Sequence, residues 1–174
     1  ENYTSLFSSQ VDWKNSHIDS KNGIVLNNET NLRIVSISAD NKNTKDTENI
    51  RFFPQISSKI SYPLMLETEG TMQSLSPSIT PILAPYNNYT ENIIITNSNI
   101  SSLNRASSIT EWESGPRINY GLEWFNEIDN GTSMSISLGQ SYRFNKNNSD
   151  TIDELSDYFL SSNVSILPLF MIHM

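Results

Sequence analysis

Apolar and polar residues alternate along the chain, most regularly over residues 132–145. The apolar positions of this segment are Met134, Ile136, Leu138, Tyr142 and Phe144, and Gln140 is the polar residue that breaks the series. Serine, glycine and arginine occupy the positions between them. Successive side chains of a β-strand point to opposite faces, so the segment predicts a strand with one apolar face and one small, polar face.

Residues 117–126 follow the same rule. Their apolar positions are Ile118, Tyr120, Leu122 and Trp124, which alternate with Arg117, Asn119, Gly121 and Glu123. Between the two segments, Asn130-Gly131 is typical of a tight hairpin turn. The pattern predicts an antiparallel hairpin that turns within 126–131 and presents one shared apolar face.

Further strands are predicted at 3–13, 23–39, 52–64 and 72–84. The last of these contains Pro77 and Pro81, which lack an N–H, and it is therefore expected to be interrupted. A polar loop is expected at 40–49, a much longer connection at 86–115, and 152–160 is the only weak candidate for a helix. The whole chain, 1–174, is predicted to be one all-β domain, an antiparallel up-and-down meander of about seven or eight strands.

The chemistry of the two faces favours a membrane barrel over a soluble β-sandwich. A sandwich normally carries many charges on its outer face, whereas the polar positions here are mostly serine, asparagine, threonine and glycine. Membrane strands need only about 9–11 residues and alternate in this way. Aromatic residues near the predicted strand ends resemble the interfacial girdles of such barrels. A soluble β-sandwich used for adhesion or binding, and another outer-membrane barrel or porin segment, remain as alternatives.

Charge and composition exclude several classes of function. The chain has 19 acidic and 11 basic residues, a net charge of −8, and no basic cluster, which argues against nucleic-acid binding. Cysteine is absent, so disulfides and thiolate metal sites are excluded. The two histidines, His17 and His173, are far apart, and no nucleophile elbow, zinc-protease motif or phosphate-binding loop occurs. The sequence therefore predicts no enzyme activity, no catalytic residue, no metal and no cofactor.

Two motifs resemble the LptD (OstA) family of lipopolysaccharide-assembly proteins, in its C-terminal barrel region. They are Gly115-Pro-Arg117-Ile-Asn119-Tyr120-Gly121-Leu122 and Leu138-Gly139-Gln140-Ser141-Tyr142-Arg143. The segments 81–85 and 92–105 precede them in the order that the family shows. Ser156-Asp157-Tyr158 is similar to the alphaproteobacterial branch. The family-like residues are Gly115, Arg117, Asn119, Tyr120, Gly121, Gly139, Gln140 and Tyr142.

This resemblance implies a transporter in the outer membrane of a Gram-negative bacterium. Family members insert lipopolysaccharide into the outer leaflet through a large barrel. Their partners are a lipoprotein plug of the LptE type and a periplasmic bridge of the LptA type. The apolar positions would then face lipid, and the lipid-facing residues expected are Ile118, Tyr120, Leu122, Trp124, Met134, Ile136, Leu138 and Tyr142.

The chain also departs from the family pattern. Ser108-Ile-Thr-Glu111 stands where the family has Gly-x-Asp-Arg, and residues 166–174 lose the alternation. We therefore expect a fragment of a larger barrel with an anomalous end at 166–174. Because its strands are of uneven length, the fragment is predicted to form an open, curved sheet whose first and last strands do not pair.

Overall fold

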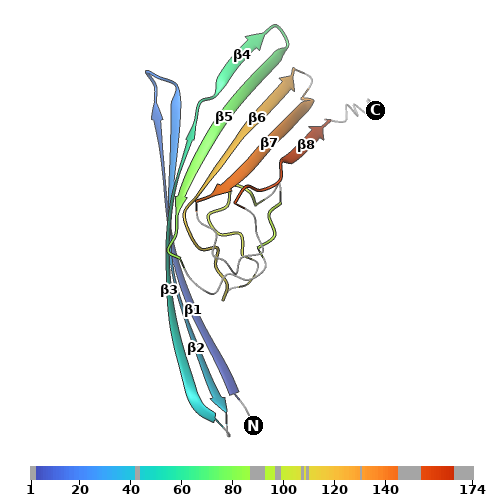
Figure 1. Ribbon diagram of the computed structural model, residues 1–174. Helices are drawn as coiled ribbons and strands as arrows, with labels where there is room; N and C mark the ends of the chain where they lie inside the picture. Colours follow the sequence, from blue (N-terminus) through green and yellow to red (C-terminus); the bar gives the residue numbers. More distant parts are fainter. Residues whose placement is uncertain are drawn as a thin grey trace, which may run out of the picture.

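A computed structural model describes residues 3–41, 44–86, 93–96, 99–106, 108, 110–129, 131–144 and 154–166. Within these residues the chain forms a single antiparallel sheet and contains no helix (Figure 1). The strands are β1 (Tyr3–Asp19), β2 (Ile24–Asn41), β3 (Thr44–Ser61), β4 (Leu64–Thr68), β5 (Thr71–Leu83), β6 (Arg117–Ile128), β7 (Ser133–Arg143) and β8 (Phe159–Ser165). Their spatial order is β1-β2-β3-β5-β6-β7-β8, with β4 paired to β5. The predicted up-and-down meander is confirmed.

The sheet is open, as predicted, and its edges are β1 and β8 in the part of the chain that the structure describes. No second sheet packs against it there, so the β-sandwich alternative is wrong. Only six large apolar side chains are buried among the described residues, while most others are exposed. A soluble sandwich would bury such side chains between its two layers.

Strand β5 differs from the prediction, because it runs without a break from Thr71 to Leu83. Its pairing with β6 is continuous, whereas its pairing with β3 and β4 is interrupted at Tyr62-Pro63. The carbonyl of Pro77 points to that side and accepts the Tyr62 N–H at 3.1 Å. Carbonyl and N–H of one residue point the same way in a strand, so the donor that Pro77 lacks would also face β3. The proline therefore weakens the pairing of β5 with β3 and leaves its pairing with β6 intact.

The predicted loop at 40–49 is also wrong. Strand β2 extends to Asn41 and β3 begins at Thr44. The backbone ladder between them continues through polar residues, because it needs only N–H and C=O groups and no apolar face. As a result β1, β2 and β3 have 17, 18 and 18 residues, against 12 and 11 for β6 and β7.

The helix considered at 152–160 is absent from its described part, which is extended. Leu155 forms a bridge with Tyr142, and the Arg143 N–H donates to the Glu154 carbonyl at 2.7 Å. Strand β8 then begins at Phe159. Residues 167–174, which hold nearly all of the end expected to be anomalous, lie outside the described residues. No helix long and apolar enough to cross a membrane occurs in the described ranges.

The two long connections of the chain lie at the same end of the sheet. One end has the short turns 20–23, 69–70 and 129–132. Gly23, Gly70 and Gly131 have φ values of 70°, 79° and 81° in these turns, a conformation that glycine adopts without strain. The other end carries 42–43, 84–116 and 144–158. The described parts of 84–116 fold back against one face of the sheet (Figure 1).

Candidate functional site

The two faces of the sheet are chemically different. We call the face that contacts loop 84–116 the inner face and the opposite one the outer face. Register places Leu122 opposite Leu138 and Trp124 opposite Ile136, while Arg117 is opposite Arg143 on the other parity. Directly opposed residues share a face, so the hairpin of β6 and β7 has one apolar outer face. The predicted hairpin and its shared apolar face are confirmed.

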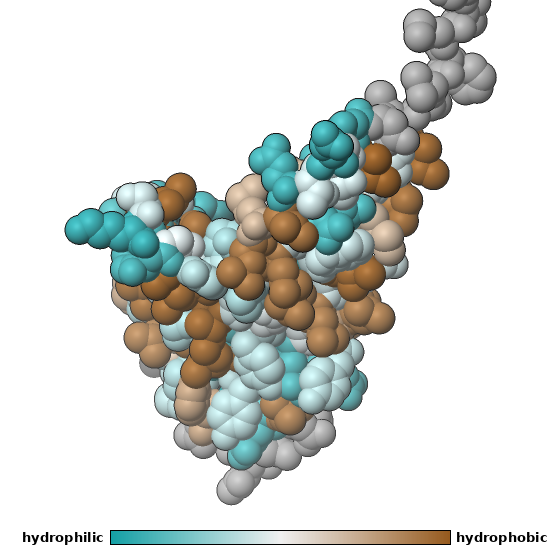
Figure 2. Space-filling view, turned by 90° about the horizontal axis from the view of Figure 1, so that it is seen from above, coloured by the Kyte–Doolittle hydropathy of each residue, from teal (hydrophilic) through white to brown (hydrophobic). Residues whose placement is uncertain are grey.

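The outer face carries all eight residues that the sequence marked as apolar on this hairpin. They are Ile118, Tyr120, Leu122, Trp124, Met134, Ile136, Leu138 and Tyr142. Leu122 and Leu138 are 42% and 44% exposed, although both are large aliphatic side chains. Seen from above, apolar surface covers much of the middle of the molecule and the most hydrophilic surface gathers at its protruding tips (Figure 2). The outer face thus presents apolar surface that the described part of the chain leaves largely uncovered.

On the inner face, loop 84–116 is held by a buried tryptophan. Trp112 is fully buried, and its ring stacks on Phe53 of β3 with 4.6 Å between ring centroids and 13° between planes. The guanidinium of Arg33 lies 4.8 Å from the centroid of the same ring. Val35 and Ile37 of β2 complete this cluster. Stacking, cation–π attraction and burial all act on one side chain of the loop.

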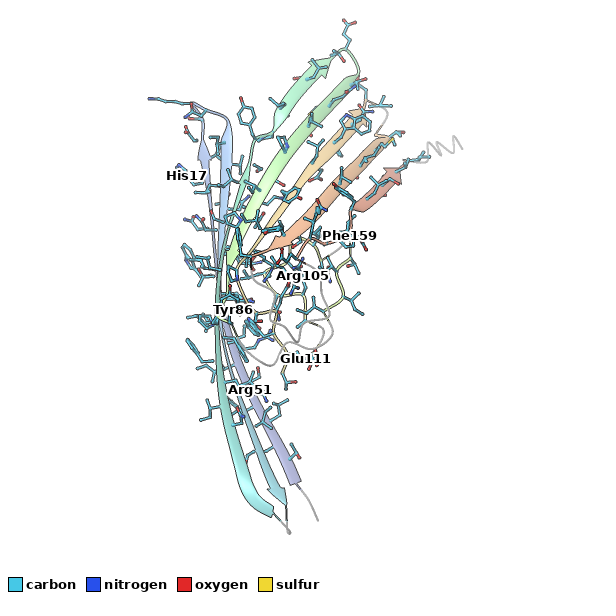
Figure 3. The ribbon with its side chains drawn as sticks, viewed as in Figure 1. His17, Arg51, Tyr86, Arg105, Glu111 and Phe159 are labelled. Atoms are coloured by element: carbon cyan, nitrogen blue, oxygen red, sulfur yellow. The ribbon has the colours of Figure 1, made fainter. Side chains whose placement is uncertain are left out.

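The next residue, Glu113, is the centre of a buried ionic cluster. Its carboxylate accepts hydrogen bonds from Arg105 of the same loop and, at 2.5 Å, from Nη2 of Arg143 on β7. Nη2 of Arg117 on β6 lies 3.4 Å from Oε2. We call Arg105, Arg117 and Arg143 the arginine cluster; each is at most 8% exposed, and Glu113 is fully buried. Figure 3 shows Arg105 between the loop and the lower ends of β6 and β7.

The ionisation of Glu113 follows from this arrangement. Burial alone would raise the pKa of the Glu113 carboxyl. The charge of Arg117, the hydrogen bond and charge of Arg105, and the charge of Arg143 outweigh burial, so the pKa lies below its ordinary value. Glu113 is therefore a carboxylate at neutral pH, which suits a group that accepts three hydrogen bonds from arginine and pairs with a third guanidinium.

Side chains of the sheet also bind the backbone of the loop. Gln55 donates to the Glu113 carbonyl at 3.1 Å, and Arg51 donates to the Thr110 carbonyl at 3.3 Å. Arg117 donates to the Leu103 carbonyl. At the base of the loop, the Gly115 N–H donates to the Pro85 carbonyl at 3.2 Å. Buried carbonyl groups of an irregular segment need such donors, so the polar inner face is what allows the loop to dock.

Two glycines make room for the loop. Gly121 and Gly139 are opposite each other on the inner face. A Cβ at Gly139 would lie 3.2 Å from Cδ1 of Ile100, and a Cβ at Gly121 would lie 2.6 Å from the Leu138 carbonyl oxygen. Gly115 has φ 82°, and a Cβ there would lie 2.8 Å from the Tyr86 ring. The glycines of the family-like motifs thus sit where backbone or loop approaches closely.

The remaining family-like residues hold the β7–β8 connection. The Tyr120 hydroxyl donates to Gln140 at 2.5 Å, and Gln140 donates to the Ser156 carbonyl at 2.9 Å. Asn119 accepts from the Ser141 hydroxyl at 2.7 Å on the inner face. Gln140 breaks the apolar parity in sequence, and it is buried because the segment at Ser156 covers it.

Two cavities lie on the inner face beside the loop. One, of about 170 Å³, is lined by Ser78, Thr80, Gly121, Gly139 and Ile100, among others. The other, of about 600 Å³, lies between strands β1 to β3 and the loop residues Ser101 to Asn104. Its polar lining includes Gln10, Asp12, Asn31 and Arg33. No group of acidic and histidine residues able to hold a metal ion occurs in the described part of the chain.

Sequence reasoning missed the docked loop and its contacts. The sequence pattern places Trp112 and Glu113 in a long connection and gives no reason to single out Arg33, Phe53 or Arg105. Glu113 and Arg117 are four residues apart in sequence, but the cluster also needs Arg105 and Arg143, which only the fold brings near. A tryptophan next to a glutamate in a long connection is the one local feature of the sequence that points to docking.

Comparison with known proteins gives one family. The family model described as LptD, LPS transport system D, matches residues 6–173 of the chain. A search of the curated proteins found no match.

Proposed function

The chain belongs to the LptD family, and we propose that it forms part of the wall of an outer-membrane barrel that inserts lipopolysaccharide into the outer leaflet. The family serves lipopolysaccharide transport and outer-membrane assembly and is not a family of enzymes. Its members are outer-membrane proteins. The observation that carries the proposal is the division of one open sheet into an apolar outer face and a polar inner face.

The proposed wall has its outer face in lipid and its inner face in a hydrated lumen. Exposed leucine and isoleucine side chains on the outer face would be stabilised by hydrocarbon, at about 25 cal/mol per Å² removed from water. The residues proposed to face lipid on β6 and β7 are Ile118, Tyr120, Leu122, Trp124, Met134, Ile136, Leu138 and Tyr142. We propose that the whole chain, 1–174, acts as this one barrel segment.

The lengths of the connections support an orientation. Outer-membrane barrels have short periplasmic turns and longer extracellular loops. We therefore propose that turns 20–23, 69–70 and 129–132 are periplasmic and that loop 84–116 enters the lumen from the extracellular side. Strands β1 to β3 exceed the roughly 9–11 residues that a bilayer requires, so their ends near 42–43 would extend outside the membrane.

The open edges and the inner face indicate where partners would act. Unpaired backbone groups in lipid cost several kcal/mol each, so β1 and β8 would pair with further strands of the same barrel wall. We propose that a lipoprotein of the LptE type occupies the lumen and that a bridge of the LptA type delivers lipopolysaccharide at the periplasmic end, as the family resemblance implies.

Depletion of the protein in the cells that make it tests this function. Lipopolysaccharide reaching the cell surface would be measured with a label that cannot cross the outer membrane. We expect newly made lipopolysaccharide to be lost from the surface while other barrels still insert. Unchanged surface delivery would overturn the proposal, and loss of a solute flux instead would indicate another type of outer-membrane barrel.

A further inference from the structure

Two arginines face each other across strands β6 and β7. Arg117 and Arg143 are direct cross-strand partners on the inner face, and they are 1% and 8% exposed. Like charges directly opposite each other destabilise a sheet, and burial strengthens the repulsion. An anion between them removes this penalty, and in the structure the carboxylate of Glu113 supplies it.

Glu113 does not neutralise the cluster. Three guanidinium groups and one carboxylate leave an excess of two positive charges among these buried side chains. Nε and Nη1 of Arg117 and Nη1 of Arg105 are buried without a hydrogen-bond partner among the described residues. An arginine offers five N–H donors, so the cluster can bind more acceptor oxygens than one carboxylate has.

The division of the cluster between sheet and loop shows what can change. Arg117 and Arg143 belong to the barrel strands and stay in place, whereas Glu113 and Arg105 belong to loop 84–116. If the loop moves away from the inner face, the two strand arginines keep their positions and lose their anion. The two strand arginines are therefore the fixed part of the site, and Glu113 and Arg105 are the part that the loop carries.

We propose that Arg117 and Arg143 form a binding site for a phosphate group, which Glu113 occupies while the loop is docked. A phosphomonoester carries about −1.5 to −2 charges at pH 7 and three acceptor oxygens, which match the two positive charges that remain on the strands when the loop takes Glu113 and Arg105 away. Arginine pairs bind phosphate oxygens in a bidentate fashion. The inference deepens the proposed function, since it assigns the phosphate groups of the transported glycolipid a place on the lumen wall.

The larger cavity lies beside the loop residues that precede this site. Leu103 and Asn104, which line it, directly precede Arg105, and the Leu103 carbonyl is bound by Arg117. A phosphate group in the cavity would meet the loop backbone next to the cluster. Exchange then requires only that the loop with Glu113 moves out as the phosphate moves in, and no covalent bond forms or breaks.

Binding of defined probes to the full-length protein in detergent micelles tests the proposal. The probes are inorganic pyrophosphate and a diphosphorylated glycolipid, with the dephosphorylated glycolipid as its counterpart. Trp112 fluorescence reports loop release once the two other tryptophans of the chain are replaced, as Trp13→Phe and Trp124→Phe. We expect saturable binding of the phosphorylated probes. Arg143→Gln should weaken this binding by at least about tenfold, because charge-assisted hydrogen bonds are lost. Glu113→Gln should bind more tightly than the unaltered protein, because the internal competitor loses its charge.

Lys59→Gln is the matched control, because Lys59 lies on the inner face of β3 outside the cluster. Unboiled electrophoretic migration checks that each variant remains a folded barrel, and Arg143→Lys, which keeps the charge, should retain part of the binding. Response to the phosphorylated glycolipid alone identifies a headgroup site, and response to pyrophosphate identifies a site for the free anion as well. Equal losses in Arg143→Gln and Lys59→Gln, or binding that ignores the phosphates, would overturn the proposal.

The two hypotheses fail separately. A protein that delivers lipopolysaccharide to the surface but binds no phosphate through Arg143 contradicts only the phosphate site. A protein that binds phosphate through Arg143 but has no part in lipopolysaccharide delivery contradicts only the proposed function.

Discussion

Strands β6 and β7 present the same backbone to two surroundings, and the two faces are stabilised in different ways. On the outer face, neighbouring apolar side chains are exposed or half-exposed, and no second layer of the described chain packs over them. On the inner face, arginine and asparagine side chains are buried, and the loop supplies hydrogen-bond acceptors to the arginines. The outer face thus depends on its solvent, while the inner face depends on contacts made by a distant part of the chain.

The largest expected effect is on the inner face. Glu113→Gln removes the anion shared by three buried arginines, and breaking a buried ion pair costs about 3–5 kcal/mol. We expect the loop to undock while the strands stay paired, which hydrogen exchange of residues 99–116 and of β6 would show. Glu111→Gln, in the same loop but outside the cluster, should change docking by less than about 0.5 kcal/mol. Equal effects of the two variants would show that the ionic cluster around Glu113 does not hold the loop.

A charge on the outer face should instead hinder insertion of the protein into the membrane. Leu138→Arg places a guanidinium in lipid and is expected to cost about 2–4 kcal/mol if the position is near the bilayer midplane. Ser137→Arg, one residue earlier on the inner face, should be milder because it meets a hydrated lumen. The fraction of protein that inserts into liposomes measures both. Equal tolerance of the two variants would mean that the outer face does not meet hydrocarbon.

Substituting alanine for Gly121 and for Gly139 compares two kinds of close contact on the inner face. A Cβ at Gly121 would lie 2.6 Å from a backbone oxygen, which can move only with the strand, so about 1–3 kcal/mol should be lost. At Gly139 the Cβ would meet the end of the Ile100 side chain at 3.2 Å, which can rotate, and the loss should stay below about 1 kcal/mol. Chemical denaturation of the two variants ranks them, and the reverse order would contradict the packing described.

The smallest effect concerns pH. The pKa of Glu113 is lower in the folded protein than in the unfolded chain, so its stabilising contribution is complete above the unfolded value of about 4.3. It is lost as the pH falls from there through the folded pKa. Loop docking should therefore be constant between about pH 8 and 5 and weaken only in acid. In Glu113→Gln this acid step should vanish, and a docking transition near neutral pH would show that another group controls the loop.

The outer face could be predicted because its pattern is local. Alternation of residues such as Leu122 and Trp124 follows from strand geometry alone, and Gly131 specifies the turn within a few residues. The length of β2 and β3 could not be predicted in the same way. Their polar ends, near 40–49, pair through backbone groups that no side-chain pattern marks.

The inner site was hidden because its contacts join distant residues. Gln55 binds Glu113 across 58 positions, and Arg51 binds Thr110 across 59. The continuity of β5 was missed for a related reason. A proline is harmful only on the side to which its missing N–H would point, and the sequence does not say which neighbour lies there.

These separations along the chain have a consequence for the order of folding. Hairpins such as β6–β7 close over a few residues, whereas docking of the loop must wait until strands that are nearly 60 positions away are in place. Until then Arg117 and Arg143 repel each other without compensation on a hairpin that is already formed. We expect a late kinetic phase, reported by Trp112 after the strands have formed, that is slowed when Glu113 is replaced. The barrel wall would thus be completed first and its lumen filled afterwards.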